Sequence, residues 1–305
     1  MSGRWTAAEM PSLDGSVAVV TGANSGLGLV TARELARHGA RVVIACRDVG
    51  KGAAALEQIR AEVGSADGVS VSELDLASLA SVRAFAARTG NEFERIDLLV
   101  NNAGVMAPPR RLTEDGFELQ IGTNHLGHFA LTGLLLERLV VAPAPRVVTV
   151  SSGAHRLGWM RFDDLMWERR YNNWLAYGQS KLANLLFCFE LQRRAVAAGS
   201  PLLSLAAHPG YARTNLQFAA PRPHEQLIMR ITNPLLGQSA DMGALPSLYA
   251  AVADVPGGSF IGPNGFAEQR GYPHIVTAAS RAYNEDDQRR LWELSSELTG
   301  VTYSF

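Results

Sequence analysis

The segment Thr21–Gly28 reads TGANSGLG and joins an apolar run, Val17–Val20, to a helix-like stretch. A strand that ends in a glycine-rich turn and opens a helix is typical of proteins that hold a dinucleotide pyrophosphate. The glycines let the backbone approach the ligand, and the first N–H groups of the helix face its negative charge. The spacing of Gly22, Gly26 and Gly28 is wider than in GxGxxG, so a glycine-rich turn without function is the alternative. The rest of the chain must decide between the two.

Short β-branched runs alternate with helix-length periodic segments along the chain. Strands are predicted at 17–20, 41–45, 69–74, 96–100, 146–150, 202–207 and 259–261, and helices at 27–38, 51–63, 79–89, 116–139, 176–198, 242–253 and 285–298. Several strands are apolar almost throughout, as expected for a parallel sheet covered by helices on both faces. The pattern predicts an α/β fold: a single doubly wound Rossmann-type domain, residues 1–305, with a mainly parallel seven-stranded sheet and an N-terminal leader at 1–14.

Two long connections interrupt the alternation of strands and helices, at 153–175 and at 211–240. Each follows the carboxyl end of a predicted strand, where open α/β sheets bind their ligands. Long loops at such an edge are typical of lids and pocket walls, and a plain surface insertion is the alternative. We expect both segments to be active-site loops that present apolar side chains to a ligand.

Charge and composition exclude several classes of function. The 28 basic and 29 acidic residues give a formal net charge of −1, which provides no electrostatic basis for binding nucleic acid or an anionic membrane. Cys46 and Cys188 lie in apolar segments and indicate buried thiols, not a disulfide framework. No apolar stretch is long enough for a signal peptide or a membrane anchor. We therefore expect a cytoplasmic protein.

The most informative side chains for catalysis are Tyr177 and Lys181 in YGQSK. Residues four apart share one face of a helix, so the phenol and the ammonium can point into the same cleft. A free tyrosine, with a pKa near 10, is a poor acid–base catalyst at neutral pH, and a neighbouring cation lowers that pKa. A pair at this spacing on a solvated helix face would mean nothing, so its context is decisive.

Other polar residues are predicted near this pair. Ser151 and Ser152 end a predicted strand in VTVSS, where a hydroxyl can hold a substrate carbonyl oxygen. Neighbours at a strand end point in opposite directions, so only one of them can face the substrate. Asn124 lies in GTNHLGHF, on a helix expected to pass under the same site, although a polar residue that merely bends a helix would look the same. His125 and His128 have no acidic or cysteine cluster beside them, so no metal site is predicted.

Taken together, these motifs resemble the short-chain dehydrogenase/reductase family over nearly the whole chain. NNAG at 101–104, LDLAS at 74–78 and HPGYART at 208–214 follow further predicted strands in the order of the family. ACRD, TNHLGHF, SSGAH and YGQSKLANLLF are most similar to the retinol-dehydrogenase-like and WW-domain-oxidoreductase-like branch. The interval between Ser152 and Tyr177 is longer than is usual in the family.

The resemblance implies a role for each matching residue. Tyr177 would be the acid in reduction and the base in oxidation, and Lys181 would lower its pKa and hold the nicotinamide ribose. Ser152 would fix the substrate oxygen, and Asn124 would anchor a water chain that supplies protons to Lys181. The implied cofactor-binding residues are Gly22, Asn24, Ser25, Gly26, Leu27, Gly28, Arg47, Asp75, Leu76, Asn102, Ala103, Gly104, Tyr177, Lys181, Pro209, Gly210 and Thr214.

Two hypotheses of function follow. The first is an NADP(H)-dependent oxidoreductase acting on a carbonyl or alcohol, in which Arg47 after the second strand pairs with the 2′-phosphate. The second is a dinucleotide-binding sensor or scaffold of the same fold that has lost the chemistry. The presence of all four catalytic residues favours the enzyme. The sequence does not choose among retinoids, steroids, quinones, aldehydes or ketones as substrate, nor between a monomer and a homodimer.

Overall fold

The computed structural model describes residues 4–64, 67–211 and 238–305. Its sheet has eight strands in the order β3-β2-β1-β4-β5-β6-β7-β8. The strands are β1 (Val17–Thr21), β2 (Arg41–Cys46), β3 (Val69–Glu73), β4 (Leu98–Asn101), β5 (Arg146–Val150), β6 (Leu203–Ala207), β7 (Phe260–Pro263) and β8 (Pro273–Ile275). All pairs from β3 to β7 are parallel, and the strand order reverses at β1 and β4. The predicted doubly wound α/β fold is confirmed.

The predicted count of seven strands is wrong, because β8 extends the sheet by one antiparallel strand. Ile275 pairs with Ile261 of β7, and the two strands form a hairpin at the edge of the sheet. The strand is only three residues long, begins at a proline and exposes His274 and Ile275. So short a segment has neither the length nor the apolar alternation by which a strand is predicted.

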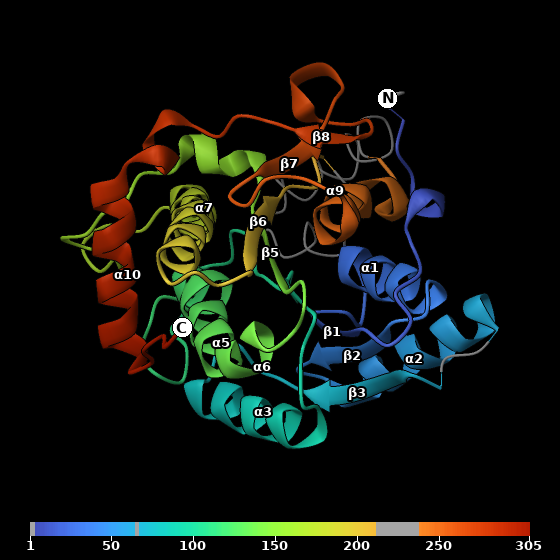
Figure 1. Cartoon of the computed structure of the whole chain (residues 1–305). Coiled ribbons are helices and arrows are strands. Elements are labelled where there is room, and N and C mark those ends of the chain that lie inside the picture. The colour runs from blue at the N-terminus through green and yellow to red at the C-terminus, as the bar shows by residue number, and fades with distance from the viewer. Residues whose placement is uncertain (1–3, 65–66, 212–237) are drawn as a thin grey trace.

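Helices cover both faces of the sheet, as Figure 1 shows. One face carries α1 (Gly26–Arg37), α2 (Val49–Val63) and α9 (Ala240–Val252), and the other carries α3 (Leu79–Glu92), α5 (Gly127–Leu134) and α7 (Asn173–Ala197), with α10 (Glu285–Thr299) packed outside α7. Alternate residues of β1 serve the two cores. Val20 packs with Leu35 of α1 on the first face, and Val19 packs with Phe129 of α5 on the second.

The long helix predicted at 116–139 is broken into four pieces. These are α4 (Leu119–Ile121), the π-helical turn η2 (Gly122–Leu126), α5 and α6 (Leu136–Val140). A Cβ on Gly127 would lie 2.4 Å from the Leu76 carbonyl oxygen, so the chain packs closely here. Single π-helical turns inside helices occur often at functional sites, and this one contains Asn124.

The helix ends that the sequence predicted most clearly are confirmed in α10. The Asn284 side chain accepts the N–H groups of Asp286 and Asp287, and Gly300 closes the helix with a left-handed φ of 63°. At the other end of the chain, the described part of the predicted leader packs on the domain. Trp5 meets Tyr249 edge to face, and Met10 is buried.

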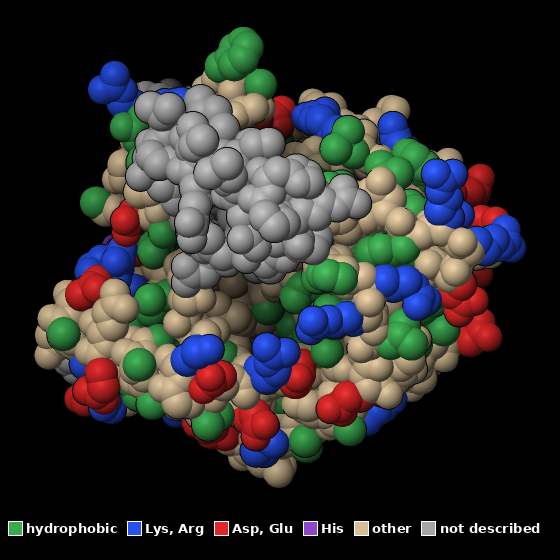
Figure 2. All heavy atoms as spheres, turned by 180° about the vertical axis from the view of Figure 1, so that it is seen from behind, with side chains coloured by type: hydrophobic (Ala, Val, Ile, Leu, Met, Phe, Trp, Pro, Cys, Tyr) green, Lys and Arg blue, Asp and Glu red, His purple; other side chains and the backbone are tan. Residues whose placement is uncertain are grey.

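The mixed surface charge and the burial of both cysteines are as the sequence predicted. Figure 2 shows Lys and Arg side chains interspersed with Asp and Glu side chains over one side of the molecule. Both cysteines are buried and free. In the described part of the chain, no helix is both long and apolar enough to cross a membrane.

Candidate active site

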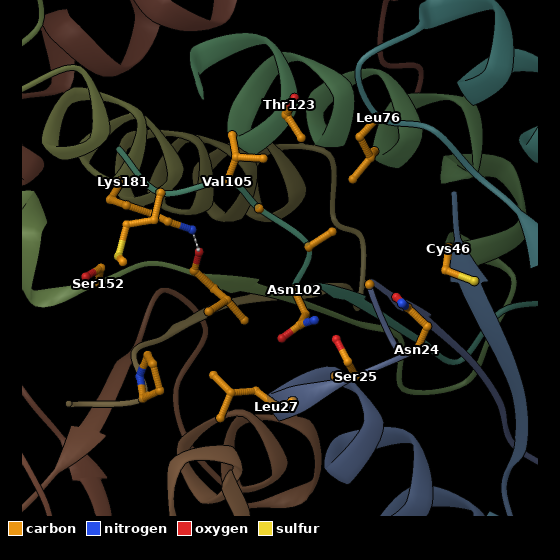
Figure 3. Close-up of a pocket in the computed structure, with 18 of the residues that line it drawn as sticks. Asn24, Ser25, Leu27, Cys46, Leu76, Asn102, Val105, Thr123, Ser152 and Lys181 are labelled. Carbon is orange, nitrogen blue, oxygen red and sulfur yellow. Dashed lines mark hydrogen bonds between the residues drawn. The ribbon is translucent and has the colours of Figure 1, made fainter. Parts of the chain in front are cut away.

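A cavity of about 620 Å³ lies at the carboxyl edge of the sheet. In Figure 3, Ser152 and Lys181 lie at one end of it and Asn24 and Cys46 at the other, with Asn102 between them. The sequence-predicted residues that line it are Gly22, Asn24, Ser25, Gly26, Leu27, Gly28, Arg47, Asp75, Leu76, Asn102, Ala103, Gly104, Ser152, Tyr177, Lys181, Pro209 and Gly210. Asn124 is not part of the lining, and Thr214 lies outside the described residues.

The glycine-rich turn at the start of α1 has the shape of a phosphate cradle. Gly22 and Gly26 have left-handed φ values of 66° and 58°. A Cβ on Gly28 would lie 2.5 Å from the Gly22 carbonyl oxygen and 2.5 Å from Asn102 Nδ2, so only glycine fits there. The turn therefore brings bare backbone to the cavity wall, as close contact with a pyrophosphate requires.

The N-terminus of α1 differs from those of α2, α3, α7, α9 and α10. Each of those helices begins at a residue whose side chain accepts a backbone N–H of its own first turn. Ser25 occupies the equivalent position in α1 and makes no such hydrogen bond among the described residues. The first N–H groups of α1 thus have no capping side chain beside the cavity, which suits an anionic ligand.

The glycine-rich turn is tied to the NNAG segment through Thr21. The Thr21 hydroxyl accepts the N–H groups of Asn102 and Ala103, both at 2.9 Å. Asn102 Nδ2 in turn donates to the Thr21 carbonyl at 2.7 Å. His128 Nε2 lies 2.9 Å from the same hydroxyl, while its Nδ1 bonds the Asn124 carbonyl. Burial lowers the pKa of His128 to about 4, so this ring is a neutral bridge between β1 and the helix that carries Asn124.

The far end of the cavity is formed by the residues after β2. Arg47 is exposed there, and Asp48 caps α2 by accepting the N–H of Lys51. Lys51 Nζ lies 3.4 Å from the Asp48 carboxylate. Sequence reasoning did not include Cys46, Asp48 or Lys51 among the cofactor-binding residues, although ACRD places Cys46 and Asp48 on either side of Arg47. The structure shows one acidic and two basic side chains at this end.

Tyr177 and Lys181 lie on one face of α7, as their spacing predicted. Tyr177 is 5% exposed and Lys181 is 3% exposed. Lys181 Nζ donates to the Val150 carbonyl at 3.0 Å (Figure 3) and lies 5.8 Å from the centre of the Tyr177 ring. Burial lowers the pKa of Lys181 to about 8, because the charged ammonium loses hydration.

The expected lowering of the Tyr177 pKa by Lys181 is not what the structure shows. Burial raises the pKa of Tyr177 to about 12, and a hydrogen bond with Ser152 opposes that rise. Desolvation outweighs the neighbouring cation because Lys181 is directed at the Val150 carbonyl and not at the phenol oxygen. In this structure the phenol of Tyr177 therefore holds its proton at neutral pH.

Asn124 is buried directly behind the cavity wall. Its side chain clamps Val105, accepting the Val105 N–H at 2.8 Å and donating to the Val105 carbonyl at 3.0 Å. Nδ2 also donates to Ser180 Oγ on α7 at 2.9 Å. A Cβ on Gly104 would lie 3.0 Å from Asn124 Oδ1 and 3.5 Å from Lys181 Nζ, so Gly104 separates the two polar side chains.

The two adjacent serines have different surroundings. Ser151 Oγ donates to the Lys181 carbonyl at 2.7 Å and is buried. Ser152 Oγ accepts the Ala154 N–H and takes part in the hydrogen bond with Tyr177. The second serine therefore has its hydroxyl beside the phenol, while the first is occupied with the backbone of α7.

The segment 153–175 contributes fewer side chains to the cavity than expected. Its described lining residues are Ala154 and Trp174. Leu165 is buried in the core cluster beside α7, with Met160, Phe162 and Met166 packed against it, and Trp167 is buried under Arg161. The expectation that the apolar residues of this segment face a ligand is therefore wrong for most of them: they pack against the protein. Of the other loop, Tyr211 lines the cavity, whereas Phe218, Leu227, Ile228 and Met229 lie outside the described residues.

A buried polar cluster around Glu118 supports the cavity wall and was missed by sequence reasoning. Glu118 accepts the N–H groups of Gln120 and Ile121 and the Tyr171 hydroxyl. Gln120 Oε1 accepts the Ala107 N–H at 2.8 Å, where the backbone has a positive φ of 49°. The cluster joins 153–175 to the segment that follows NNAG. Burial raises the pKa of Glu118.

The histidines on the broken helix are core residues, as predicted. His125 Nε2 bonds Ser295 Oγ at 2.7 Å, and burial lowers the pKa of His125 to about 3. Residues 4–64, 67–211 and 238–305 contain no group of His, Cys, Asp or Glu suited to holding a metal ion.

Comparison with known proteins places this site in a family. The family model described as short chain dehydrogenase matches residues 16–222. Human (Homo sapiens) retinol dehydrogenase 13 is 45% identical over 298 residues, covering 95% of this chain and 86% of that protein. The crystal structure of an uncharacterized protein from Mycobacterium paratuberculosis is 51% identical, with a TM-score of 0.83, and covers 99% of this chain and 100% of that one.

A further structure comes with a bound dinucleotide. RhlG of Pseudomonas aeruginosa, solved as an active-site complex with NADP, is 25% identical with a TM-score of 0.64, and the match covers 82% of this chain and 94% of that one. The family match spans well over half of the chain, and the relatives cover nearly all of it. This chain belongs to the short-chain dehydrogenase/reductase family.

Proposed function

We propose that this protein is an NADP(H)-dependent oxidoreductase that transfers a hydride between the nicotinamide and a bulky, apolar carbonyl or alcohol. The observation that carries the proposal is one continuous cavity, with the glycine-rich turn at one end and Ser152, Tyr177 and Lys181 at the other. An anion cradle and an acid–base pair in the same space suit a dinucleotide whose reactive end must meet a substrate. The names of the retinol dehydrogenase relatives agree with alcohol–carbonyl chemistry.

The residues present fit such a cofactor. The bare turn at Gly22 and Gly28 and the N-terminus of α1, which lacks a side-chain cap, would hold the pyrophosphate. Asp75 and Leu76 would border the adenine, and Asn102 to Gly104 the adjoining ribose. Lys181 would hold the nicotinamide ribose, and Pro209 and Gly210 would line its ring.

In the proposed reaction the cofactor carries the hydride and the protein carries the proton. The cofactor supplies or accepts the hydride. Tyr177 keeps its proton at neutral pH, with a pKa of about 12, so it can donate that proton to a carbonyl oxygen during reduction. Ser152, which hydrogen-bonds Tyr177, would hold the same oxygen from a second side and stabilise its developing charge.

Lys181 and Asn124 would serve the proton supply. With a pKa of about 8, Lys181 is mostly protonated at neutral pH and can pass a proton to its neighbours. Asn124 would anchor a water chain that leads to Lys181. Both hydrogens of its Nδ2 are used in holding Val105 and Ser180, so the water would be held by an oxygen atom of Asn124.

Cofactor preference depends on the end of the cavity after β2. The Arg47 guanidinium is exposed there and can pair with a 2′-phosphate, and Lys51 adds a second positive charge. We expect NADP(H) to be preferred over NAD(H) by at least about tenfold, a difference of roughly 1.4 kcal/mol. Steady-state kinetics with both cofactors test this. Arg47→Ala should remove most of the preference, and equal Michaelis constants in the unaltered protein would contradict it.

The apolar substrate preference rests on Val105, Met106, Pro108 and Trp174. These four side chains line the cavity, and the Trp174 ring meets the Tyr177 ring edge to face at 6.4 Å. Burying apolar surface against them is favourable by about 25 cal/mol per Å². A large hydrophobic aldehyde or ketone should therefore bind better than a small polar one.

A further inference from the structure

Three loops meet behind the nicotinamide end of the cavity, at an ion cluster that the proposed chemistry does not use. His208 follows β6, Arg156 lies in the 3₁₀ turn η3 (Gly153–Leu157), and Glu268 ends the turn η5 (Phe266–Glu268) between β7 and β8. Figure 1 shows β6, β7 and β8 side by side at one edge of the sheet. His208 is 2% exposed, so its partners decide where its ring proton lies.

The contacts of His208 fix its protonated nitrogen. Nδ1 accepts the Gly210 N–H at 3.3 Å, so it carries no proton. The proton is therefore on Nε2, which lies 3.1 Å from Glu268 Oε2, in an electrostatic contact that lacks the alignment of a hydrogen bond. A carboxylate facing one ring nitrogen is the usual means by which a protein selects a histidine tautomer.

The backbone around Glu268 is strained in a way that supports this geometry. Ala267 and Glu268 both have positive φ values, 49° and 55°, in a conformation that costs free energy for residues other than glycine. Such strain persists only where surrounding contacts enforce it. On the facing strand, a Cβ on Gly262 would lie 2.1 Å from His208 Nε2, so glycine leaves the space that the ring occupies.

The same hairpin lies directly against the cavity wall. The Tyr211 N–H donates to the Gln269 carbonyl at 2.8 Å, and a Cβ on Gly210 would lie 2.4 Å from that carbonyl oxygen. Pro209, Gly210 and Tyr211 line the cavity where the nicotinamide would lie. The chain of contacts runs from the Glu268 carboxylate through the His208 ring to the Gly210 amide.

We propose that Glu268 is a positioning residue for the cofactor: it fixes the His208 tautomer, and His208 thereby holds Gly210 and Pro209 in place at the nicotinamide wall. The cofactor part of this inference rests on the proposed function. Arg156 also contacts Glu268, at 3.1 and 3.3 Å, but its side chain is 46% exposed and also bonds the Thr277 carbonyl. Arg156 therefore provides a matched control, since its loss leaves the His208 contact intact.

The test compares Glu268→Met with Arg156→Met. Glu268→Met keeps the size of the side chain and removes the acceptor. It should raise the calorimetric dissociation constant for NADP⁺ by about five- to tenfold, the effect of losing one electrostatic contact of the His208 ring, with kcat at saturating cofactor within about twofold. Arg156→Met should change both values by less than about twofold. Equal effects of the two variants, or no effect of either, would overturn the proposal.

A second readout does not depend on cofactor. Nitrogen-15 spectra of the imidazole rings should show His208 with its proton on Nε2 in the unaltered protein and a mixture of tautomers in Glu268→Met, with the peak assigned by His208→Gln. An unchanged tautomer in Glu268→Met would refute the role of Glu268, whether or not the protein binds NADP⁺. Absence of NADP⁺ binding by the unaltered protein would instead refute the proposed function. His208→Gln keeps a donor toward Glu268 and removes the acceptor of the Gly210 N–H. It should weaken NADP⁺ binding as Glu268→Met does, and unchanged binding in this variant would overturn the proposal.

Discussion

Replacing Lys181 by methionine should make the cofactor-free protein more stable while abolishing its activity. Lys181 is buried, and burial lowers its pKa from 10.5 to about 8, so its ammonium is held in the folded state at a cost. A pKa shift of this size corresponds to about 3 kcal/mol of unfolding free energy, as an upper bound. The hydrogen bond from Nζ to the Val150 carbonyl would be lost, at a cost of about 1 kcal/mol.

The loss of that bond does not leave the carbonyl without a partner. Asn184 Nδ2 also donates to the Val150 carbonyl at 3.0 Å. The variant should therefore be about 2 kcal/mol more stable than the unaltered protein at pH 7. A methionine of similar length packs into the space, and a charged group retained at such a cost is expected at a functional site.

The pH dependence gives the sign of the effect. The folded pKa lies below the unfolded one, so between about pH 8 and 10.5 the unfolded chain binds more protons and the unaltered protein gains stability as pH rises. The advantage of Lys181→Met should be complete below pH 8, shrink as pH rises, and reverse above about pH 10.5, where only the lost hydrogen bond remains. Urea unfolding of both proteins across this range measures it. Lys51→Met, at a side chain that is 71% exposed, is the control and should show no such trend. A less stable Lys181→Met at pH 7, or a difference independent of pH, would refute the reasoning.

Two further predictions concern the catalytic end of the cavity. Ser152→Ala should lower kcat by about tenfold or more. Ser151→Ala should have a mild effect, because the Ser151 hydroxyl donates to the Lys181 carbonyl. The reverse ranking in steady-state kinetics would exclude Ser152 as the oxygen-binding serine. Catalytic efficiency should rise with chain length over a series of aldehydes, and the rise should be smaller in Trp174→Ala; a flat series would show that the cavity does not select for apolar bulk.

The sequence predicted the parts of the fold that depend on local patterns. Seven strands and the caps of α10 were found because buried parallel strands are continuous apolar runs and because Asn284 and Gly300 are specific helix signals. β8 was missed because three residues on an edge carry no periodicity. The π-helical turn at Asn124 was missed because it arises from tertiary contacts, such as Gly127 against Leu76, that no local pattern encodes.

The lining of the cavity was predicted more completely than its electrostatics. Motif positions such as Gly28, Asn102 and Gly210 all face the cavity, since motifs sit at the carboxyl ends of strands. Spacing along α7 could not predict that Lys181 would turn to the Val150 carbonyl and leave the Tyr177 pKa raised. The contacts of Glu268 could not be predicted, because its partners Arg156 and His208 come from loops far apart in the sequence.

The most direct test of the central claim is turnover by Tyr177→Phe, which keeps the ring and removes only the proton-transfer group. Oxidation of NADPH in the presence of a hydrophobic aldehyde, followed by its near-ultraviolet absorbance, should be measurable in the unaltered protein. In the variant it should fall by about a hundredfold or more. Calorimetric binding of NADP⁺ should stay nearly unchanged, because the phenol hydrogen-bonds Ser152 and not the glycine-rich turn. Undiminished turnover in Tyr177→Phe would contradict the acid–base role of Tyr177, and binding of NADP⁺ without any turnover in the unaltered protein would favour a sensor or scaffold.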